Sequence, residues 1–292
     1  MKNVLKQSGK ALGFFLFYLV VGQIIVAFIV QFIMGMIASN QAKANGIPIS
    51  SQEEAVAIGT EYYAQHMGIE LAARAAFLIL AFLIFFLIRK KNYLKEISFE
   101  KTSGKKIVAA LFGAVFVIFF VNGLLNLLTP QDQLQSFQDA SSVLYTYPLW
   151  QAILANALLV PIAEEIVFRG LMFSRLQKAM PNIAVALITS ILFGLVHGQL
   201  IWMLFAFVIG LVLSFVRIKT GSILPTIIMH VLINTYATLL SYQVIVIPSY
   251  AIFYTLFAIG GLCIFPCIFL MLKACKEEQT QPAEMSVSTI VM

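Results

Sequence analysis

Eight apolar segments of spanning or near-spanning length follow one another along the 292-residue chain, joined by short links. The chain is 61% hydrophobic and 11% charged, whereas soluble domains average about 45–50% and 25%. A hydrocarbon core about 30 Å thick needs roughly 20 helical residues to cross it. The sequence therefore predicts an all-α fold, a polytopic transmembrane bundle of about eight helices at residues 11–38, 70–88, 107–128, 149–178, 182–197, 200–216, 222–241 and 249–272.

Two of these segments, 182–197 and 200–216, are short for a full crossing at a rise of about 1.5 Å per residue. They either cross the membrane at a tilt or form a hairpin that does not cross it completely. The sequence leaves both arrangements open.

The basic residues indicate how the bundle is oriented. If the N-terminus is cytoplasmic and the segments alternate, only Lys43 lies in an external link, while Arg74 and Arg169 lie within segments. Positive charge gathers on the cytoplasmic side of membrane proteins, so both termini are predicted to be cytoplasmic. The basic residues at cytoplasmic positions are Lys2, Lys6, Lys10, Arg89, Lys90, Lys91, Lys95, Lys101, Lys105, Lys106, Arg175, Lys178, Arg217, Lys219, Lys273 and Lys276.

A single membrane domain, residues 1–276, is predicted to make up almost the whole chain, followed by a polar, disordered cytoplasmic tail, residues 277–292. No nucleotide-binding motif and no soluble domain interrupts the apolar segments. The net charge of +6 resides mainly at helix ends, without a basic stripe interleaved with aromatic residues. We therefore expect the lipid bilayer as a partner and no nucleic acid, and any chemistry must lie within the membrane domain.

Three charged residues, Glu164, Glu165 and Arg169, interrupt the apolar segment 149–178. A charge at mid-bilayer costs roughly 2.5–3.5 kcal/mol on insertion scales, so such residues indicate function. Residues four apart share a helix face, so Glu165 is expected to pair with Arg169 while Glu164 points elsewhere. A buried carboxylate without a cation is suited to act as a general base. The alternative is a structural ion pair beside a neutral or interfacial Glu164.

Phe193 and His197 lie at the end of the segment 182–197. Glu164 lies 17 residues before Pro181, and His197 lies 16 residues after it. In an antiparallel helical hairpin both would therefore lie about 24–26 Å from the turn, at equal depth. A carboxylate and an imidazole placed in this way can share one water molecule. Taken alone, a histidine at the end of an apolar helix is more commonly an interfacial or packing residue.

His230 and Asn234 are four residues apart and share one face of the segment 222–241. Both side chains can donate hydrogen bonds, so together they could stabilise an oxyanion. Alternatively, His230 could bind zinc together with His197 and Glu164, or the pair could only join helices. Combined with a glutamate base, these groups predict the hydrolysis of an amide bond.

The three motifs together resemble a known family. EExxxR at 164–169, FxxxH at 193–197 and HxxxN at 230–234 are similar in order and spacing to the CAAX protease and bacteriocin-processing intramembrane proteases. This group, also called CPBP or Abi, includes the type II CAAX prenyl endopeptidases. The resemblance covers about residues 140–241, the predicted protease core. It implies an eight-helix bundle with a water-filled cavity and an endopeptidase that acts on a membrane-associated protein or peptide.

The resemblance also implies a role for each matching residue. Glu164 would be the water-activating base with His197 beside it, and His230 with Asn234 would stabilise the oxyanion. Members of the family have been called metalloproteases, so a zinc ion held by Glu164, His197 and His230 stays open. The chain has no HExxH motif, which favours a metal-free glutamate mechanism without a cofactor. The supporting residues would be Glu165, Arg169 and Phe193.

The substrate is less constrained than the site. Family members cleave prenylated C-terminal tails, process peptide pheromones or bacteriocins, or confer immunity to bacteriocins. The short links and the charge bias fit an integral, multi-pass protein of a bacterial plasma membrane, for which CAAX cleavage would be an improbable native task. Two alternatives are a non-catalytic scaffold or bacteriocin immunity protein, and a proton-coupled transporter. The absence of an inverted repeat in the sequence argues against the transporter.

Overall fold

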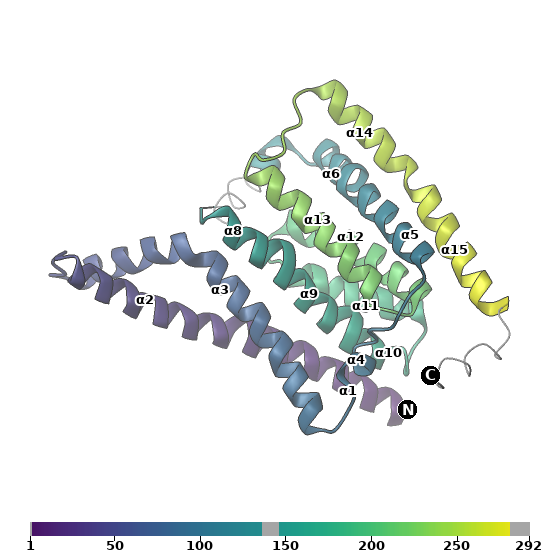
Figure 1. Ribbon diagram of the computed structural model, residues 1–292, viewed down its shortest axis with the longest axis horizontal. Coiled ribbons are helices and arrows are strands. Elements are labelled where there is room, and N and C mark those ends of the chain that lie inside the picture. The colour runs from purple at the N-terminus through teal and green to yellow at the C-terminus, as the bar shows by residue number, and fades with distance from the viewer. Residues whose placement is uncertain (1, 136–145, 281–292) are drawn as a thin grey trace, which may run out of the picture.

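The computed structural model describes residues 2–135 and 146–280, which form helices joined by links, with no strand among them (Figure 1). π-helical segments, labelled η, continue several helices without a break. The elements of the first half are α1 (Lys2–Leu16), η1 (Phe17–Ile25), α2 (Val26–Ala44), α3 (Gln52–Ile88), α4 (Tyr93–Glu96), α5 (Gly104–Val115), η2 (Phe116–Val121) and α6 (Asn122–Leu128).

The second half begins with one continuous helix, Leu149–Leu176, which carries the EExxxR motif. This helix comprises five consecutive elements, and five further helices follow it. The elements are α8 (Leu149–Ala152), η4 (Ile153–Leu159), α9 (Val160–Glu165), η5 (Ile166–Met172), α10 (Phe173–Leu176), α11 (Asn182–Leu195), α12 (Leu200–Thr220), α13 (Leu224–Ser241), α14 (Tyr250–Leu262) and α15 (Ile264–Thr280).

Within the described residues, seven helices are long and apolar enough to cross a membrane. The predicted polytopic helical bundle is therefore confirmed. The eighth predicted segment is α11, which is short, as expected, with 14 residues. The predicted shortness of 200–216 was wrong, because α12 has 21 residues and is long enough to cross. Its last turn contains Arg217 and Lys219, so the apolar run ends before the helix does and the predicted segment was too short.

The first two helices are longer than the apolar segments that predicted them. α1, η1 and α2 form a continuous helix of 43 residues, and α3 has 37. At about 1.5 Å per residue, both exceed a 30 Å hydrocarbon core. α3 begins early because the hydroxyl oxygen of Ser51 accepts a hydrogen bond from the backbone N–H of Glu54, an N-cap that starts the helix well before the apolar run. The α2–α3 hairpin therefore projects from the bundle (Figure 1).

Local signals end and begin the later helices. Gly221, with φ of 72°, ends α12 in the left-handed conformation that glycine adopts without strain. Pro225 then lies in the first turn of α13, and the Ser249 hydroxyl caps α14. α15 continues to Thr280, into the stretch 277–292 that was predicted to be a disordered tail, and residues 281–292 of that tail lie outside the described residues.

Two glycines let α11 and α12 pack closely as an antiparallel hairpin. A Cβ atom on Gly194 would lie 2.7 Å from the carbonyl oxygen of Met203, and one on Gly210 would lie 2.9 Å from the Cβ of Ser190. No larger side chain fits at either contact without moving backbone or a buried neighbour. The hairpin thereby holds Phe193 and the backbone carbonyl of Gly210 at fixed positions beside the central helix.

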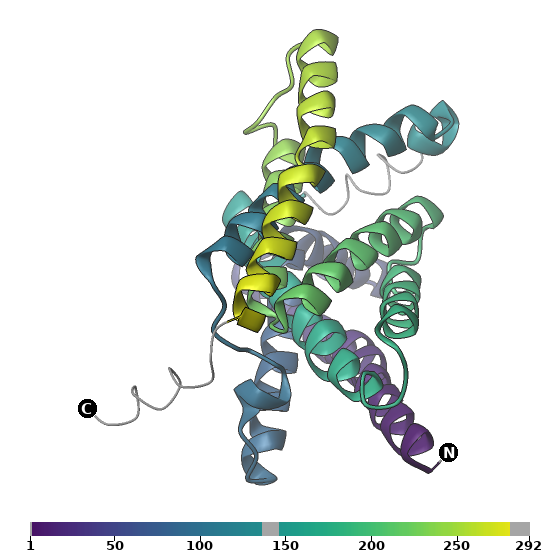
Figure 2. The same ribbon diagram turned by 90° about the vertical axis from the view of Figure 1, so that its right-hand side faces the viewer.

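Two buried apolar clusters flank the centre of the molecule. The first joins α1, α3 and η5 and includes Phe15, Phe168 and Leu171. The second joins α5, η2, α12, α13 and α15 and includes Leu213 and Met229. Figure 2 shows α14 and α15, in yellow-green and yellow, on a different side of the bundle from α1, in purple. The central helix Leu149–Leu176 packs against α1, α3 and α13 and carries its polar residues between the two clusters.

Candidate functional site

One cavity of about 580 Å³ brings four predicted residues together. Glu164 enters it from α9, His197 from the turn after α11, and His230 and Asn234 from α13. Glu164 and His230 are buried, with exposed fractions of 7% and 4%, while His197 and Asn234 are half-buried. Three segments far apart in the sequence therefore place two imidazoles, a carboxylate and an amide around one space.

The predicted pair of Glu165 and Arg169 is present beneath the cavity. Arg169 Nη1 lies 2.8 Å from Glu165 Oε1, and both side chains are completely buried. Arg169 Nη2 also donates to the carbonyl oxygen of Gly210, at 3.2 Å. Removing either partner of such a pair would leave an uncompensated charge in an apolar interior. The pair therefore links the central helix rigidly to α12.

His230 lies between the two glutamates of the motif. Its Nδ1 is 3.0 Å from Glu165 Oε1, and its Nε2 is 3.8 Å from Glu164 Oε2. A carboxylate only accepts hydrogen bonds, so Nδ1 carries a proton and donates a hydrogen bond to Glu165. Nε2 can then donate only if the ring is an imidazolium. The sequence predicted that His230 and Asn234 stabilise an oxyanion together, but it did not indicate that His230 must be doubly protonated to do so.

The tautomer of His197 is fixed by its own helix. His197 Nδ1 lies 2.7 Å from the carbonyl oxygen of Phe193, which can only accept, so Nδ1 carries the proton. In the neutral ring, Nε2 is then a free acceptor on a residue that lines the cavity. His197 can therefore accept a hydrogen bond from a water molecule or a protonated nitrogen there.

Phe193 orders the rings around the site. It packs edge-to-face against His197, with ring centroids 4.9 Å apart, and against His230 at 5.7 Å. The Arg169 guanidinium carbon lies 4.5 Å from the centre of the same ring, within cation–π range. Phe193 therefore touches three of the predicted site residues, which gives the FxxxH motif a packing role.

Tyr18 is a site residue that the sequence did not single out. It lies in η1, is buried with 4% of its surface exposed, and is a close enough neighbour of Glu164 for the two side chains to interact electrostatically. Phe168 holds the phenol ring edge-to-face, with centroids 5.4 Å apart. Nothing in one sequence marks a single tyrosine within an apolar segment as functional. Its position is decided by the packing of α1 and η1 on the central helix.

The arrangement was also tested as a metal site. Across residues 2–135 and 146–280, no group of three or more His, Cys, Asp or Glu side chains could hold a metal ion. In the set considered for zinc, His230 directs Nδ1 to Glu165 and His197 directs Nδ1 to the carbonyl oxygen of Phe193, so Nε2 is the nitrogen that each ring could offer to a metal. A zinc ion held by Glu164, His197 and His230 therefore stays a prediction.

Comparison with known proteins bears on the same region. Residues 146–236 match the family model for type II CAAX prenyl endopeptidase Rce1-like proteins. This stretch encloses all three motifs. The match confirms the resemblance to this family. The matched segment contains the four predicted residues that line the cavity and leaves out α1 to α6.

Two curated bacterial proteins are similar to the chain. "Putative membrane peptidase YdiL" of Bacillus subtilis (strain 168) is 28% identical over 109 residues, or 37% of this chain. The chain spans only 44% of the length of that relative. "UPF0177 protein YxdF" of Lactococcus lactis subsp. lactis (strain IL1403) is 29% identical over 160 residues, covering 53% of this chain and 87% of the relative. No solved structure gives a significant match.

Proposed function

We propose that this protein is an intramembrane endopeptidase of the bacterial plasma membrane that hydrolyses a peptide bond in a membrane-associated protein or peptide. The observation that carries the proposal is the convergence of Glu164, His197, His230 and Asn234 on one cavity. The match to the type II CAAX prenyl endopeptidase family and the relative named as a membrane peptidase support the same class of reaction.

In the first step, Glu164 acts as the general base. Its carboxylate takes a proton from a water molecule while the water oxygen forms a bond to the carbonyl carbon of the substrate. His197 Nε2 is available to accept the second hydrogen bond of that water and orient its lone pair. The product of this step is a tetrahedral intermediate with a negative oxygen, and Glu164 is then a carboxylic acid.

Two groups on α13 stabilise the negative oxygen. The Asn234 amide can donate from Nδ2 without any change in protonation. His230 donates from Nε2 in its imidazolium form, with Nδ1 held by the Glu165 carboxylate. In the second step, the carbon–nitrogen bond breaks and the protonated Glu164 delivers its proton to the leaving amine. The products are a carboxylic acid and an amine, and Glu164 is again ionised.

Three further residues hold these groups in place. Glu165 fixes the orientation of His230 through Nδ1, and Arg169 balances the charge of Glu165. Tyr18 lies beside Glu164, so its hydroxyl is placed to orient the carboxylate toward the cavity. These residues act through Glu164 and His230 and are positioning residues.

The test is cleavage of a library of membrane-tethered peptides by the purified protein. The wild type is compared with Glu164→Gln, which preserves the shape of the side chain and removes the base. Cleavage by the wild type, lost in the variant and unaffected by a metal chelator, is the expected result. Loss on chelation that zinc reverses would replace the glutamate mechanism by a metal-dependent one. Equal cleavage by both proteins would refute the role of Glu164.

A further inference from the structure

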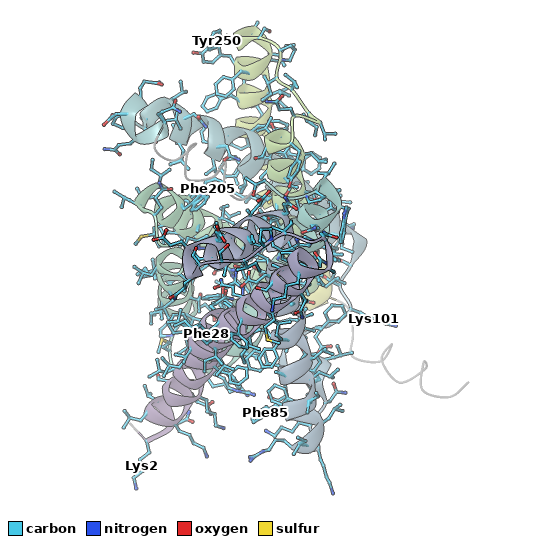
Figure 3. All side chains as sticks on the ribbon, turned by 90° about the vertical axis from the view of Figure 1, so that its left-hand side faces the viewer. Lys2, Phe28, Phe85, Lys101, Phe205 and Tyr250 are labelled. Atoms are coloured by element: carbon cyan, nitrogen blue, oxygen red, sulfur yellow. The ribbon has the colours of Figure 1, made fainter. Side chains whose placement is uncertain are left out.

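The cavity lies in one half of the molecule, away from the chain termini. Its walls come from η2 and α6, the first part of the helix Leu149–Leu176, the ends of α11 and α13, and the first parts of α12 and α14. Leu134 and Ile247, in the connections that follow α6 and α13, also line it. Figure 3 places Phe205, a residue of the cavity wall, in the half that contains Tyr250 and opposite to Lys2.

The other half of the molecule carries the basic residues, and contacts between its links define it as one face. Asn3 donates to the carbonyl oxygen of Lys178, and Glu96 pairs with Arg175. Lys105 binds Glu277 at the end of α15, with Nζ 2.7 Å from Oε1. Positive charge marks the cytoplasmic side. The face with the termini is therefore cytoplasmic. The cavity extends from Glu164 toward the opposite, extracytoplasmic face.

The route from the cytoplasmic face to Glu164 is closed by buried side chains. Phe168, Leu171 and Phe173 follow Glu164 along the central helix toward that face, and each is completely buried. Arg217, also buried, donates from Nε to the carbonyl oxygen of Arg169 at 3.1 Å. A substrate that approaches from the cytoplasm meets packed core rather than the cavity.

The wall of the cavity indicates what it can receive. Aromatic residues such as Trp202, Phe253 and Phe257 contribute to it, and Glu164 is the one carboxylate among the described lining residues. Asn122 and Asn126 donate their amide N–H groups to carbonyl oxygens of their own helix. Their side-chain oxygens can therefore accept hydrogen bonds from the backbone N–H groups of an extended chain.

We infer that the cavity takes an extended, uncharged and largely apolar stretch of polypeptide from the extracytoplasmic side. This inference rests on the proposed peptidase function, and it specifies the side of entry and the substrate class of that same site. An acidic side chain would lose its hydration in this wall and would also meet the carboxylate of Glu164, which disfavours acidic segments most strongly. The substrate is accordingly a protein or peptide segment that has already reached the outer half of the membrane.

The side of entry is tested by cysteine accessibility, independently of cleavage. The full chain carries Cys263→Ala, Cys267→Ala and Cys275→Ala together with Ala237→Cys in the cavity wall. The matched control carries Lys178→Cys on the face with the termini. Each protein is treated with a membrane-impermeant maleimide in right-side-out and in inside-out membrane vesicles. We expect Ala237→Cys to react faster in right-side-out vesicles and Lys178→Cys to react faster in inside-out vesicles.

The occupant is tested by protection of the same cysteine. A synthetic apolar peptide at ten times its dissociation constant should slow the labelling of Ala237→Cys about tenfold, since the free fraction falls in that proportion. The same peptide with two glutamates should not slow it. Preferential labelling from inside-out vesicles, labelling from neither side, or equal protection by both peptides would overturn the inference. The same protection measured in the presence of Glu164→Gln separates the two proposals: protection that persists without cleavage shows that the peptide still enters the cavity.

Discussion

The chain contains two buried Glu-x-x-x-Arg pairs with the same spacing, and they behave differently. Glu165 and Arg169 lie in the central helix, and Glu70 and Arg74 lie in α3, with Arg74 Nε 3.0 Å from Glu70 Oε1. The first pair also binds His230 and supports the cavity. Arg74 Nη1 of the second pair donates to the side-chain and backbone oxygens of Gln23, away from the cavity. An intramembrane ion pair therefore identifies a site only when other reactive groups converge on it.

The pairs also differ in burial. Both side chains of the central pair are completely buried, whereas the Arg74 side chain is 17% exposed. An exposed edge lets water compensate a charge that has lost its partner. The central pair should accordingly be the more sensitive of the two to the removal of its arginine.

The largest expected effect is on stability. Arg169→Leu leaves the Glu165 carboxylate buried without a cation and should reduce the free energy of unfolding by about 3–5 kcal/mol. Arg74→Leu should cost about 1–3 kcal/mol, because its partner can gain hydration at the exposed edge. Unfolding in detergent micelles, followed by circular dichroism against denaturant, measures both. An equal loss in the two variants would contradict the distinction between the pairs.

The next effect separates the two regions by activity. Glu164→Gln should reduce the rate of peptide cleavage at least about 100-fold, the lower end of general-base contributions. Glu70→Gln makes the same chemical change in the other region and should leave the rate per folded molecule unchanged. Initial rates with a membrane-tethered peptide, normalised to monodisperse protein, provide the comparison. A loss of activity in Glu70→Gln would connect α3 to the chemistry.

Tyr18→Phe should have a smaller effect. The substitution keeps the ring on Phe168 and removes the hydroxyl that lies beside Glu164, and the loss of one polar interaction of about 1.4 kcal/mol corresponds to about tenfold in rate. Because Tyr18 acts by orienting Glu164, the loss should appear in kcat with little change in KM. A matched control is Tyr63→Phe, which removes the hydroxyl that accepts from Gln31 at a distance from the cavity. An unchanged kcat in Tyr18→Phe would show that the phenol only fills space.

The smallest effect concerns pH and the link between α3 and α5, where Glu96 lies. Desolvation raises the pKa of Glu96, but the hydrogen bond and charge of Arg175, together with Lys91, outweigh it and hold the pKa below the usual 4.5. The stabilisation is therefore complete above pH 4.5 and is lost as the pH falls through the lowered value. Since Glu96 is partly exposed, we expect a loss of no more than about 1 kcal/mol.

Glu96→Gln should abolish this acid-dependent loss. Unfolding of the wild type and the variant is measured between pH 7 and the acid limit of solubility. A pH dependence that is the same in both proteins would assign it to other carboxylates.

Parts of the architecture followed directly from the sequence. The long apolar segments predicted the helical bundle because a chain in lipid must satisfy its backbone hydrogen bonds within each helix. The i, i+4 spacing of Glu165 and Arg169 predicted their ion pair because helical periodicity alone decides which side chains share a face. Both inferences depend only on local geometry.

Other features depended on contacts between distant segments. The sequence did not predict Tyr18 as a neighbour of Glu164, nor His230 as a donor to Glu165, because each contact joins helices whose relative rotation is set by packing. The π-helical segments η1 and η5 add to this, since their wider turns shift side chains relative to an α-helical pattern.

The sequence by itself determined the class of fold, the polar residues held in the membrane and the charge difference between the two ends of the bundle. These are local or compositional properties, and they do not require knowledge of which helices touch. Only the tertiary structure decided that Glu164, His197, His230 and Asn234 line one cavity, and that it lies in the half away from the termini. A cavity is the space that several helices leave unfilled, so its position follows from their packing and cannot be read from any one of them.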